Sequence, residues 1–125
     1  MTDNNTPPPQ KATGLTRIIR AFGYSRDGLK AAFSNEAAFR QECAAAAVMI
    51  PLAFFIAPDR VMLALMVASV LLVMIVELLN SAVEAAIDRF GPERHPLAKY
   101  AKDAGSAAVL VALILAGLVW LIALT

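Results

Sequence analysis

The sequence predicts an all-α membrane protein, with three transmembrane helices that follow an N-terminal amphipathic surface helix. Two observations support this fold class. Hydrophobic residues make up 59% of the 125 residues and charged residues 17%, whereas soluble domains average about 45–50% and about 25%. Three apolar stretches also approach the roughly 20 residues that a helix needs to cross about 30 Å of hydrocarbon. An ordinary soluble globule is therefore excluded.

Net charge and cysteine content remove further classes. The formal net charge of +1 gives no general argument for binding nucleic acid, so we expect no nucleic-acid partner. Cys43 is the single cysteine of the chain. It can form neither an intramolecular disulfide framework nor a cysteine-based zinc cluster.

The region before the first apolar stretch has two parts. Residues 1–13 include Pro7–Pro9 and lack apolar periodicity, which predicts a disordered tail. From residue 14 to about residue 41, apolar residues recur at helical spacing, with arginine and lysine on the other faces. This pattern predicts a helix in the membrane interface, with its cations near the lipid headgroups. We expect Gly23 and Gly28 to loosen this helix.

Each predicted span has a feature of its own. The first contains Pro51, which removes one backbone hydrogen bond and should kink the helix. The second continues beyond the hydrocarbon as a cytoplasmic extension. The third has eighteen residues without a charge, Ala107 to Leu124, and we expect Trp120 to anchor it at the membrane interface. The spans cover about residues 42–58, 61–90 and 104–124.

Lysine and arginine are distributed unevenly around these spans. Six lie between Lys11 and Arg40, four lie between Arg89 and Lys102, and only Arg60 lies on the opposite side. Short cytoplasmic loops hold the positive charge of membrane proteins. We therefore expect a multi-pass protein whose N-terminus and second connection are cytoplasmic and whose C-terminus is on the outer side.

Polar side chains line one face of the second predicted helix. At about 100° per residue, Glu77, Ser81, Glu84 and Asp88 fall within a narrow arc, with Asn80 beside it. A charge at the bilayer centre costs about 2.5–3.5 kcal/mol even on the mildest scale. These carboxylates must therefore face other helices, a cation or water. From the helical rise, Glu77 lies roughly 10 Å deeper than Glu84.

Further polar residues lie at the predicted water boundary. Glu36 lies near the end of the interfacial segment, and Lys102, Asp103 and Ser106 precede the third span. Carboxylates at Glu36 and Glu84, if brought together, would suit Mg²⁺, which prefers carboxylates, waters and phosphate oxygens. The sequence therefore predicts a magnesium site at the membrane surface.

Cationic side chains at the same boundary would neutralise phosphate charge. Lys102 and either Arg17 or Arg20 are candidates for this role. The chain has no phosphate-binding P-loop and no kinase glycine-rich loop, so a nucleotide site would have to be built on helices. Together these features are typical of phosphoryl transfer in which a deeper carboxylate takes a proton from a lipid alcohol.

In these residues the sequence resembles the small prokaryotic diacylglycerol kinases, integral membrane enzymes unrelated to soluble kinases. The resemblance covers roughly residues 14–124. The strongest segment is ELLNSAVEAAID, residues 77–88, in which two glutamates, an asparagine and an aspartate hold the spacing of the family signature. Three supporting segments stand in the family's order: Gly23–Leu29, Asn35–Glu42 and Ala101–Ala108.

The resemblance implies a homotrimer of three-helix protomers, with active sites shared between neighbouring subunits. It implies direct transfer of the γ-phosphoryl group of ATP, with Mg²⁺ as cofactor, to the primary hydroxyl of diacylglycerol, giving phosphatidic acid. It also implies the bacterial cytoplasmic (inner) membrane as the location, among membrane lipids, with the C-terminus periplasmic. The residues 14–125 would form one integral membrane kinase domain.

The family's residue roles carry over position by position. The resemblance implies Glu77 as the general base and, together with Ser106, as a contact to the lipid substrate. It implies Glu36 and Glu84 as metal ligands. The nucleotide-binding residues that it implies are Arg17, Tyr24, Glu36, Asn80, Glu84, Asp88, Lys102 and Asp103.

Two alternative functions stay open at this stage. Related undecaprenol kinases share the catalytic signature, so undecaprenol is an alternative acceptor. A rival of another class is a small oligomeric cation or proton channel or carrier, whose membrane carboxylates would bind cations or protons. Such a pathway needs polar groups through both leaflets, and the outer parts of the spans, such as Val61–Ser69 and Leu115–Thr125, offer almost none.

Some site residues also have simpler structural interpretations. Asp88 could be a solvated charge at a helix end, and Lys102 with Asp103 an interfacial anchor before a span. Glu36 could stand in the first turn of a helix capped by Ser34, where a carboxylate favours the positive end of the helix dipole.

Overall fold

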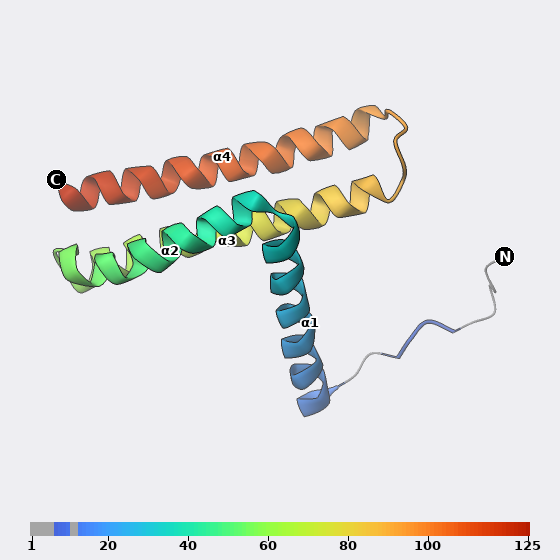
Figure 1. The fold of residues 1–125 in the computed structure, drawn as a ribbon, viewed down its shortest axis with the longest axis horizontal. Helices are drawn as coiled ribbons and strands as arrows, with labels where there is room; N and C mark the ends of the chain where they lie inside the picture. Colours follow the sequence, from blue (N-terminus) through green and yellow to red (C-terminus); the bar gives the residue numbers. More distant parts are fainter. Residues whose placement is uncertain (1–6, 11–12) are drawn as a thin grey trace. The chain divides into compact units, whose positions relative to one another are not determined.

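The computed structural model describes residues 7–10 and 13–125, and its regular structure there is entirely α-helical. The predicted all-α fold is confirmed for this part of the chain, whereas most of the predicted tail lies outside the described residues. Three of the helices are long and apolar enough to cross a membrane, as predicted. The helices are α1 (Gly14–Asn35), α2 (Ala37–Ile56), α3 (Arg60–Asp88) and α4 (Pro96–Leu124) (Figure 1).

The helix α1 is uninterrupted over its 22 residues. The expectation that Gly23 and Gly28 loosen it is wrong, because both lie within regular helix. Glycine in a helix interior costs only about 1 kcal/mol relative to alanine, which the surrounding residues offset. The large side chains of Leu15, Ile18 and Phe22 are exposed in the protomer, and a place for α1 at the membrane surface stays a prediction.

The boundary between α1 and α2 lies at Glu36, which has an extended backbone with φ −125° and ψ 111°. The predicted interfacial segment of 14–41 therefore corresponds to α1 and the first residues of α2. Arg40 joins the last residues of α1 to the start of α2, because its Nη1 donates hydrogen bonds to the carbonyl oxygens of Phe33 at 2.8 Å and Ser34 at 3.2 Å. Cationic side chains often satisfy the last carbonyls of a helix in this way.

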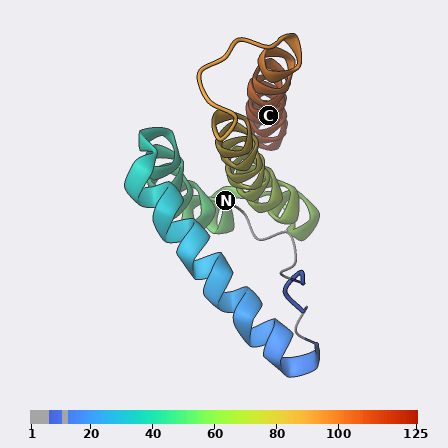
Figure 2. The same ribbon diagram turned by 90° about the vertical axis from the view of Figure 1, so that its right-hand side faces the viewer.

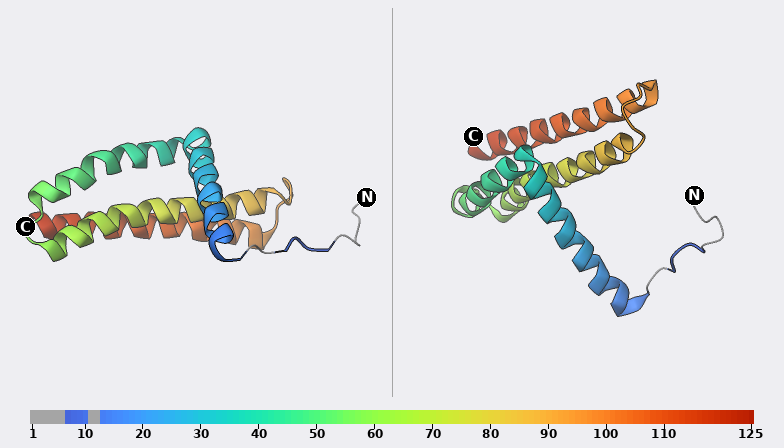
Figure 3. Two further views of the ribbon diagram at one scale, coloured as in Figure 1. Left: turned by 90° about the horizontal axis from the view of Figure 1, so that it is seen from below. Right: turned by 45° about the vertical axis from the view of Figure 1, so that its right-hand side comes forward.

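The helix α3 packs against both α2 and α4 (Figures 2 and 3). Residues at the ends of α3 and α4 determine where these helices begin and end. The Asp59 carboxylate accepts a hydrogen bond from the Met62 N–H at 2.8 Å and caps the start of α3, as aspartate commonly does. Beyond its end, Gly91 has φ +96°, a conformation that glycine adopts at little cost. His95 then caps α4, with its Nδ1 accepting from the Leu97 N–H at 3.1 Å.

The apolar core of these three helices lies near the connection between α2 and α3. Ala46 and Ala53 of α2 pack with Met66 and Val70 of α3 and with Trp120 of α4. Trp120 is only 9% exposed, and its Nε1 donates a hydrogen bond to the Met66 carbonyl oxygen at 3.3 Å. Its predicted role as an interfacial anchor is therefore wrong. The small side chains on α2 leave room for the indole inside the protein.

Candidate active site

The polar arc of α3 is partly buried at the end of the bundle opposite the apolar core. Glu77, Asn80, Ser81 and Glu84 are each half-buried, whereas Asp88 at the helix end is exposed. Side chains three and four residues apart lie on one helix face. The side chains of the arc therefore lie on one half of the α3 surface, as the periodicity predicts.

Glu36 joins this arc from the start of α2. Its Oε1 accepts a hydrogen bond of 2.6 Å from the Ser81 Oγ, and both residues are partly buried. The interpretation of Glu36 as a first-turn residue capped by Ser34 is wrong, because Glu36 itself occupies the N-cap position and its side chain does not cap α2. The carboxylate is held by α3, one helical turn from Glu84.

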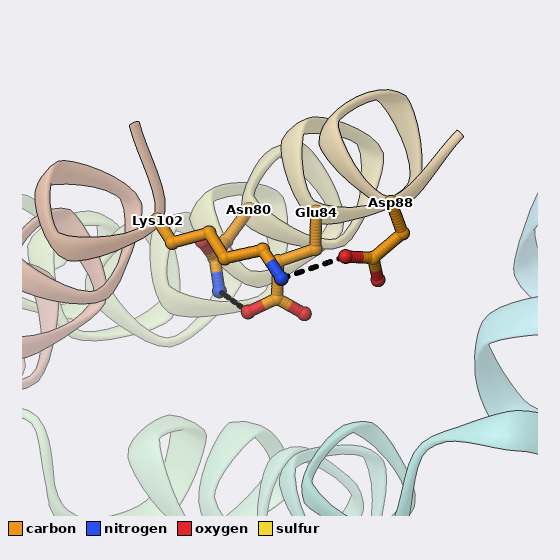
Figure 4. A network of polar contacts seen from close by, with 4 residues as sticks. All are labelled: Asn80, Glu84, Asp88 and Lys102. Carbon is orange, nitrogen blue, oxygen red and sulfur yellow. Dashed lines mark hydrogen bonds and ion pairs between the residues drawn. The ribbon is translucent and has the colours of Figure 1, made fainter. Parts of the chain in front are cut away.

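Asn80, Glu84, Asp88 and Lys102 form a polar network between α3 and α4 (Figure 4). The Asn80 Nδ2 donates to the Glu84 Oε1 at 3.3 Å, and the Lys102 Nζ donates to the Asp88 Oδ1 at 2.6 Å. Lys102 precedes the apolar part of α4. The hydrogen bond to Asp88 and the charge of that carboxylate raise the pKa of Lys102 above its usual value.

Glu42 is a residue of this site that sequence analysis did not single out. It lies on α2, half-buried, close enough to interact electrostatically with Glu77 and with Glu36. Its Oε2 is buried without a hydrogen-bond partner. The signal was present in the sequence, since Glu42 is a carboxylate within an apolar helix, as Glu77 is.

The remaining predicted site residues are exposed. Asp103 accepts a hydrogen bond of 2.5 Å from the Lys99 Nζ one turn away on α4, and Ser106 follows on the same helix. Arg17 and Tyr24 lie on α1, in the unit of the structure that ends at Ala31. Their roles at the site stay predictions.

A cavity of about 620 Å³ lies between the ends of α3 and α4 and the connection that joins them. This volume is in the usual range for small-molecule sites. Three predicted nucleotide-binding residues line it, together with residues of the connection. They are Asp88, Lys102 and Asp103, with Arg94 and His95 from the connection.

The donor chemistry of the arc suits magnesium. Among residues 7–10 and 13–125, no three histidine, cysteine, aspartate or glutamate side chains are grouped closely enough to hold a metal ion. Mg²⁺ however binds through one or two carboxylates, with waters and substrate phosphates as its other ligands. Glu36, held by Ser81, and Glu84, one helical turn from Ser81, fit that requirement. Lys102 lies close enough to Glu84 to interact with it electrostatically and could provide positive charge for phosphates.

Comparisons with known proteins identify the family of the chain. The model of the prokaryotic diacylglycerol kinase family matches residues 23–124. The diacylglycerol kinase of Haemophilus influenzae is 56% identical over 110 residues, which are 88% of this chain and 93% of that protein. The diacylglycerol kinase of Escherichia coli (strain K12) is 54% identical over 112 residues, 90% and 92% of the two chains. That of Pseudomonas aeruginosa is 54% identical over 116 residues, 92% and 94%. The chain therefore belongs to the prokaryotic diacylglycerol kinase family.

Proposed function

We propose that this protein transfers the γ-phosphoryl group of ATP to the primary hydroxyl of diacylglycerol, giving phosphatidic acid and ADP. One observation supports the proposal above all others. In a chain of this family, Glu36 from α2 is bound by Ser81 of α3 at 2.6 Å, so two carboxylates that suit magnesium share one side of α3 with the deeper Glu77. Metal ligands and a base then lie along one helix face at different depths.

Glu77 acts as the general base. It lies about two helical turns deeper than Glu84, where the hydroxyl of a membrane lipid can reach it from the headgroup region. The carboxylate accepts the hydroxyl proton while the lipid oxygen forms a bond to the γ-phosphorus. The bond between that phosphorus and the bridging oxygen of the β-phosphate breaks, and ADP leaves. Glu42 of α2 lies close enough to Glu77 to interact with it electrostatically.

The residues nearer the water hold the nucleotide. Glu36 and Glu84 would hold Mg²⁺, which neutralises charge on the phosphates. Asn80 orients Glu84 through its hydrogen bond. Lys102, kept in place by Asp88, contacts phosphate oxygens, and Asp103 lines the nucleotide cavity. Arg17 and Tyr24 of α1 complete the nucleotide site, and Ser106 contacts the lipid headgroup.

Assembly and location form part of the same proposal. The protein is a homotrimer in the bacterial inner membrane, with a cytoplasmic N-terminus, a periplasmic C-terminus and active sites shared between subunits. Large apolar side chains on the spans, such as Phe55 at 87% exposed and Leu110 at 58%, support lipid or a neighbouring subunit as their contact. The exposed apolar side chains of α1 suit a helix in the membrane interface.

A phosphate-transfer assay tests the proposal. Protein in lipid bilayers is given ATP labelled in the γ-phosphate, with diacylglycerol and undecaprenol offered side by side. We expect labelled phosphatidic acid, little labelled undecaprenyl phosphate, and no transfer once EDTA removes Mg²⁺. Preferential labelling of undecaprenol would reassign the acceptor.

The channel hypothesis is tested in the same bilayers by measuring ion flux. Ion flux through liposomes without nucleotide, combined with no lipid labelling, would overturn the kinase proposal. The apolar packing of Met66 and Trp120 near the α2–α3 connection argues against such a flux, because a polar path would have to cross it.

A further inference from the structure

Asn80 of α3 meets α4 at Gly105. A Cβ atom at position 105 would overlap the Asn80 Oδ1, and it would lie 3.2 Å from the Asn80 Cγ and 3.9 Å from the Asn80 Cβ. The amide of Asn80 therefore occupies the space in which any other side chain at position 105 would begin. The second glycine of α4, Gly117, has no neighbouring atom within 4 Å of such a Cβ.

Packing, more than hydrogen bonding, sets the direction of the Asn80 amide. Its Oδ1 is buried and has no hydrogen-bond partner, an arrangement that native proteins rarely leave without a reason. Its Nδ2 donates to the Glu84 Oε1 at 3.3 Å. With the oxygen turned towards Gly105, the nitrogen is turned towards Glu84.

Glycine in the interior of a long helix also needs a reason, because it is among the least favourable residues there. At position 105 the close approach of Asn80 supplies that reason. A side chain here could be accommodated in two ways. Either Asn80 rotates away and gives up its bond to Glu84, or α3 and α4 separate and lengthen the Lys102–Asp88 pair one turn away.

We propose that Gly105 is a positioning residue for phosphoryl transfer: the space it leaves on α4 fixes the amide of Asn80, which in turn fixes the carboxylate of Glu84. The inference rests on the proposed function, because it assigns the effect of Gly105 to the nucleotide and metal end of that site. Gly105 itself contacts neither substrate, and its effect passes through Asn80.

The matched pair Gly105→Ala and Gly117→Ala tests the proposal. Both variants place alanine in the interior of the same helix, so the gain in helix propensity is common to them. We expect Gly117→Ala to keep wild-type kinetics. Gly105→Ala should raise the KM for ATP and the Mg²⁺ concentration at half-maximal rate at least tenfold, with an unchanged KM for diacylglycerol. If the wild-type protein is active and the two variants have equal kinetic constants, the inference is overturned. An inactive wild type would instead overturn the proposed function.

A double-mutant cycle with Asn80→Ala tests the route through Asn80. Alanine at position 80 removes the overlapping atoms and leaves a Cβ contact of 3.9 Å, which is ordinary packing. Adding Gly105→Ala to Asn80→Ala should therefore change the dissociation constant for MgADP by less than twofold. It should shift the thermal midpoint by less than 1 °C. If Gly105→Ala alone fails to assemble, the double variant should restore assembly. Additive losses, or failure of that rescue, would show that Gly105 does not act through Asn80.

Discussion

The two ends of the α2–α4 bundle are packed in opposite ways. Near the α2–α3 connection, Ala53 and Met66 are fully buried, and the polar indole nitrogen of Trp120 has a backbone partner. Near the α3–α4 connection, carboxylates are half-buried, and the Glu42 Oε2 and the Asn80 Oδ1 are buried without partners. The difference separates two tasks. The first end holds the helices together, and the second keeps polar atoms available for a ligand.

This separation has a physical basis in the membrane. Apolar helices in lipid associate through close packing and interhelical hydrogen bonds, because lipid is as apolar as their side chains. Carboxylates would weaken such an interface, and they are costly away from water. Collecting them at one end keeps them out of the apolar packing that holds the helices together. Substitutions at the two ends should therefore affect different measurements.

The largest effect is expected at the polar end, from Glu77→Gln. Glutamine keeps the size of the side chain and cannot accept the lipid proton, and the loss of a general base costs about 10²–10⁴-fold in rate. We expect kcat to fall by that factor, while the thermal midpoint and assembly stay at wild-type values. The matched control is Asp59→Asn at the other end of α3, since asparagine also caps helices. Turnover retained in Glu77→Gln would remove Glu77 as the base.

The reverse pattern is expected from Met66→Ala at the apolar end. Met66 has no exposed surface, and its truncation leaves a cavity. We expect a loss of about 2 kcal/mol in the free energy of unfolding. This is the low end of the range for truncation of a large core side chain to alanine, because the hydrophobic effect does not drive helix association in lipid. Unfolding by denaturant in detergent micelles measures the loss, and the KM for ATP should not change. Leu65→Ala on the exposed side of α3 is the control, and an equal loss there would contradict the role of the core.

A smaller effect is expected from Ser81→Ala, which removes the hydrogen bond that holds Glu36. A hydrogen bond to a charged group contributes about 1.5 kcal/mol, so the apparent affinity for Mg²⁺ with ATP should fall about tenfold. Titration of the rate with Mg²⁺ at fixed ATP measures this change. Ser69→Ala is the matched control at the apolar end, because the Ser69 Oγ donates only within its own helix, to the Met66 carbonyl oxygen at 2.8 Å. Equal Mg²⁺ affinity in the two variants would show that Ser81 does not position Glu36.

The smallest effect on stability is expected from Lys102→Gln. The Lys102–Asp88 pair is exposed, with 45% and 66% of the two side chains accessible, and exposed ion pairs contribute little to folding. We expect an unchanged thermal midpoint, together with weaker binding of MgADP measured by calorimetry. Arg60→Gln, an exposed cation at the opposite end of α3, is the control and should keep wild-type affinity. A lowered midpoint in Lys102→Gln alone would assign the pair a structural role.

Features that depend on one helix could be predicted from the sequence. The polar arc of α3 follows from helical periodicity alone, and the structure places Asn80, Ser81 and Glu84 together as that periodicity requires. The three apolar helices follow equally from composition and length. In both cases neighbouring residues contain all the information.

Features that depend on two helices could not be predicted in the same way. The contact between Glu36 and Ser81 joins residues 45 positions apart, and it requires the extended backbone at Glu36. Tryptophan is a residue type that commonly anchors helices at the membrane interface. Only the packing of α2 and α3 around Trp120 shows that this one is buried. The approach of Asn80 to Gly105 also leaves no local trace in the sequence.

The hydrogen bonds of Arg40 at the end of α1 matter for protein engineering. The Arg40 Nη1 donates to two carbonyl oxygens at once, and the ammonium of lysine lies one atom closer to the backbone and is more strongly hydrated than a guanidinium. Arg40→Lys keeps the charge, yet it would leave the carbonyl oxygens at the end of α1 without this partner, only a few residues from Glu36, a proposed magnesium ligand. Screens that treat these two cations as equivalent would therefore classify a damaging exchange as silent.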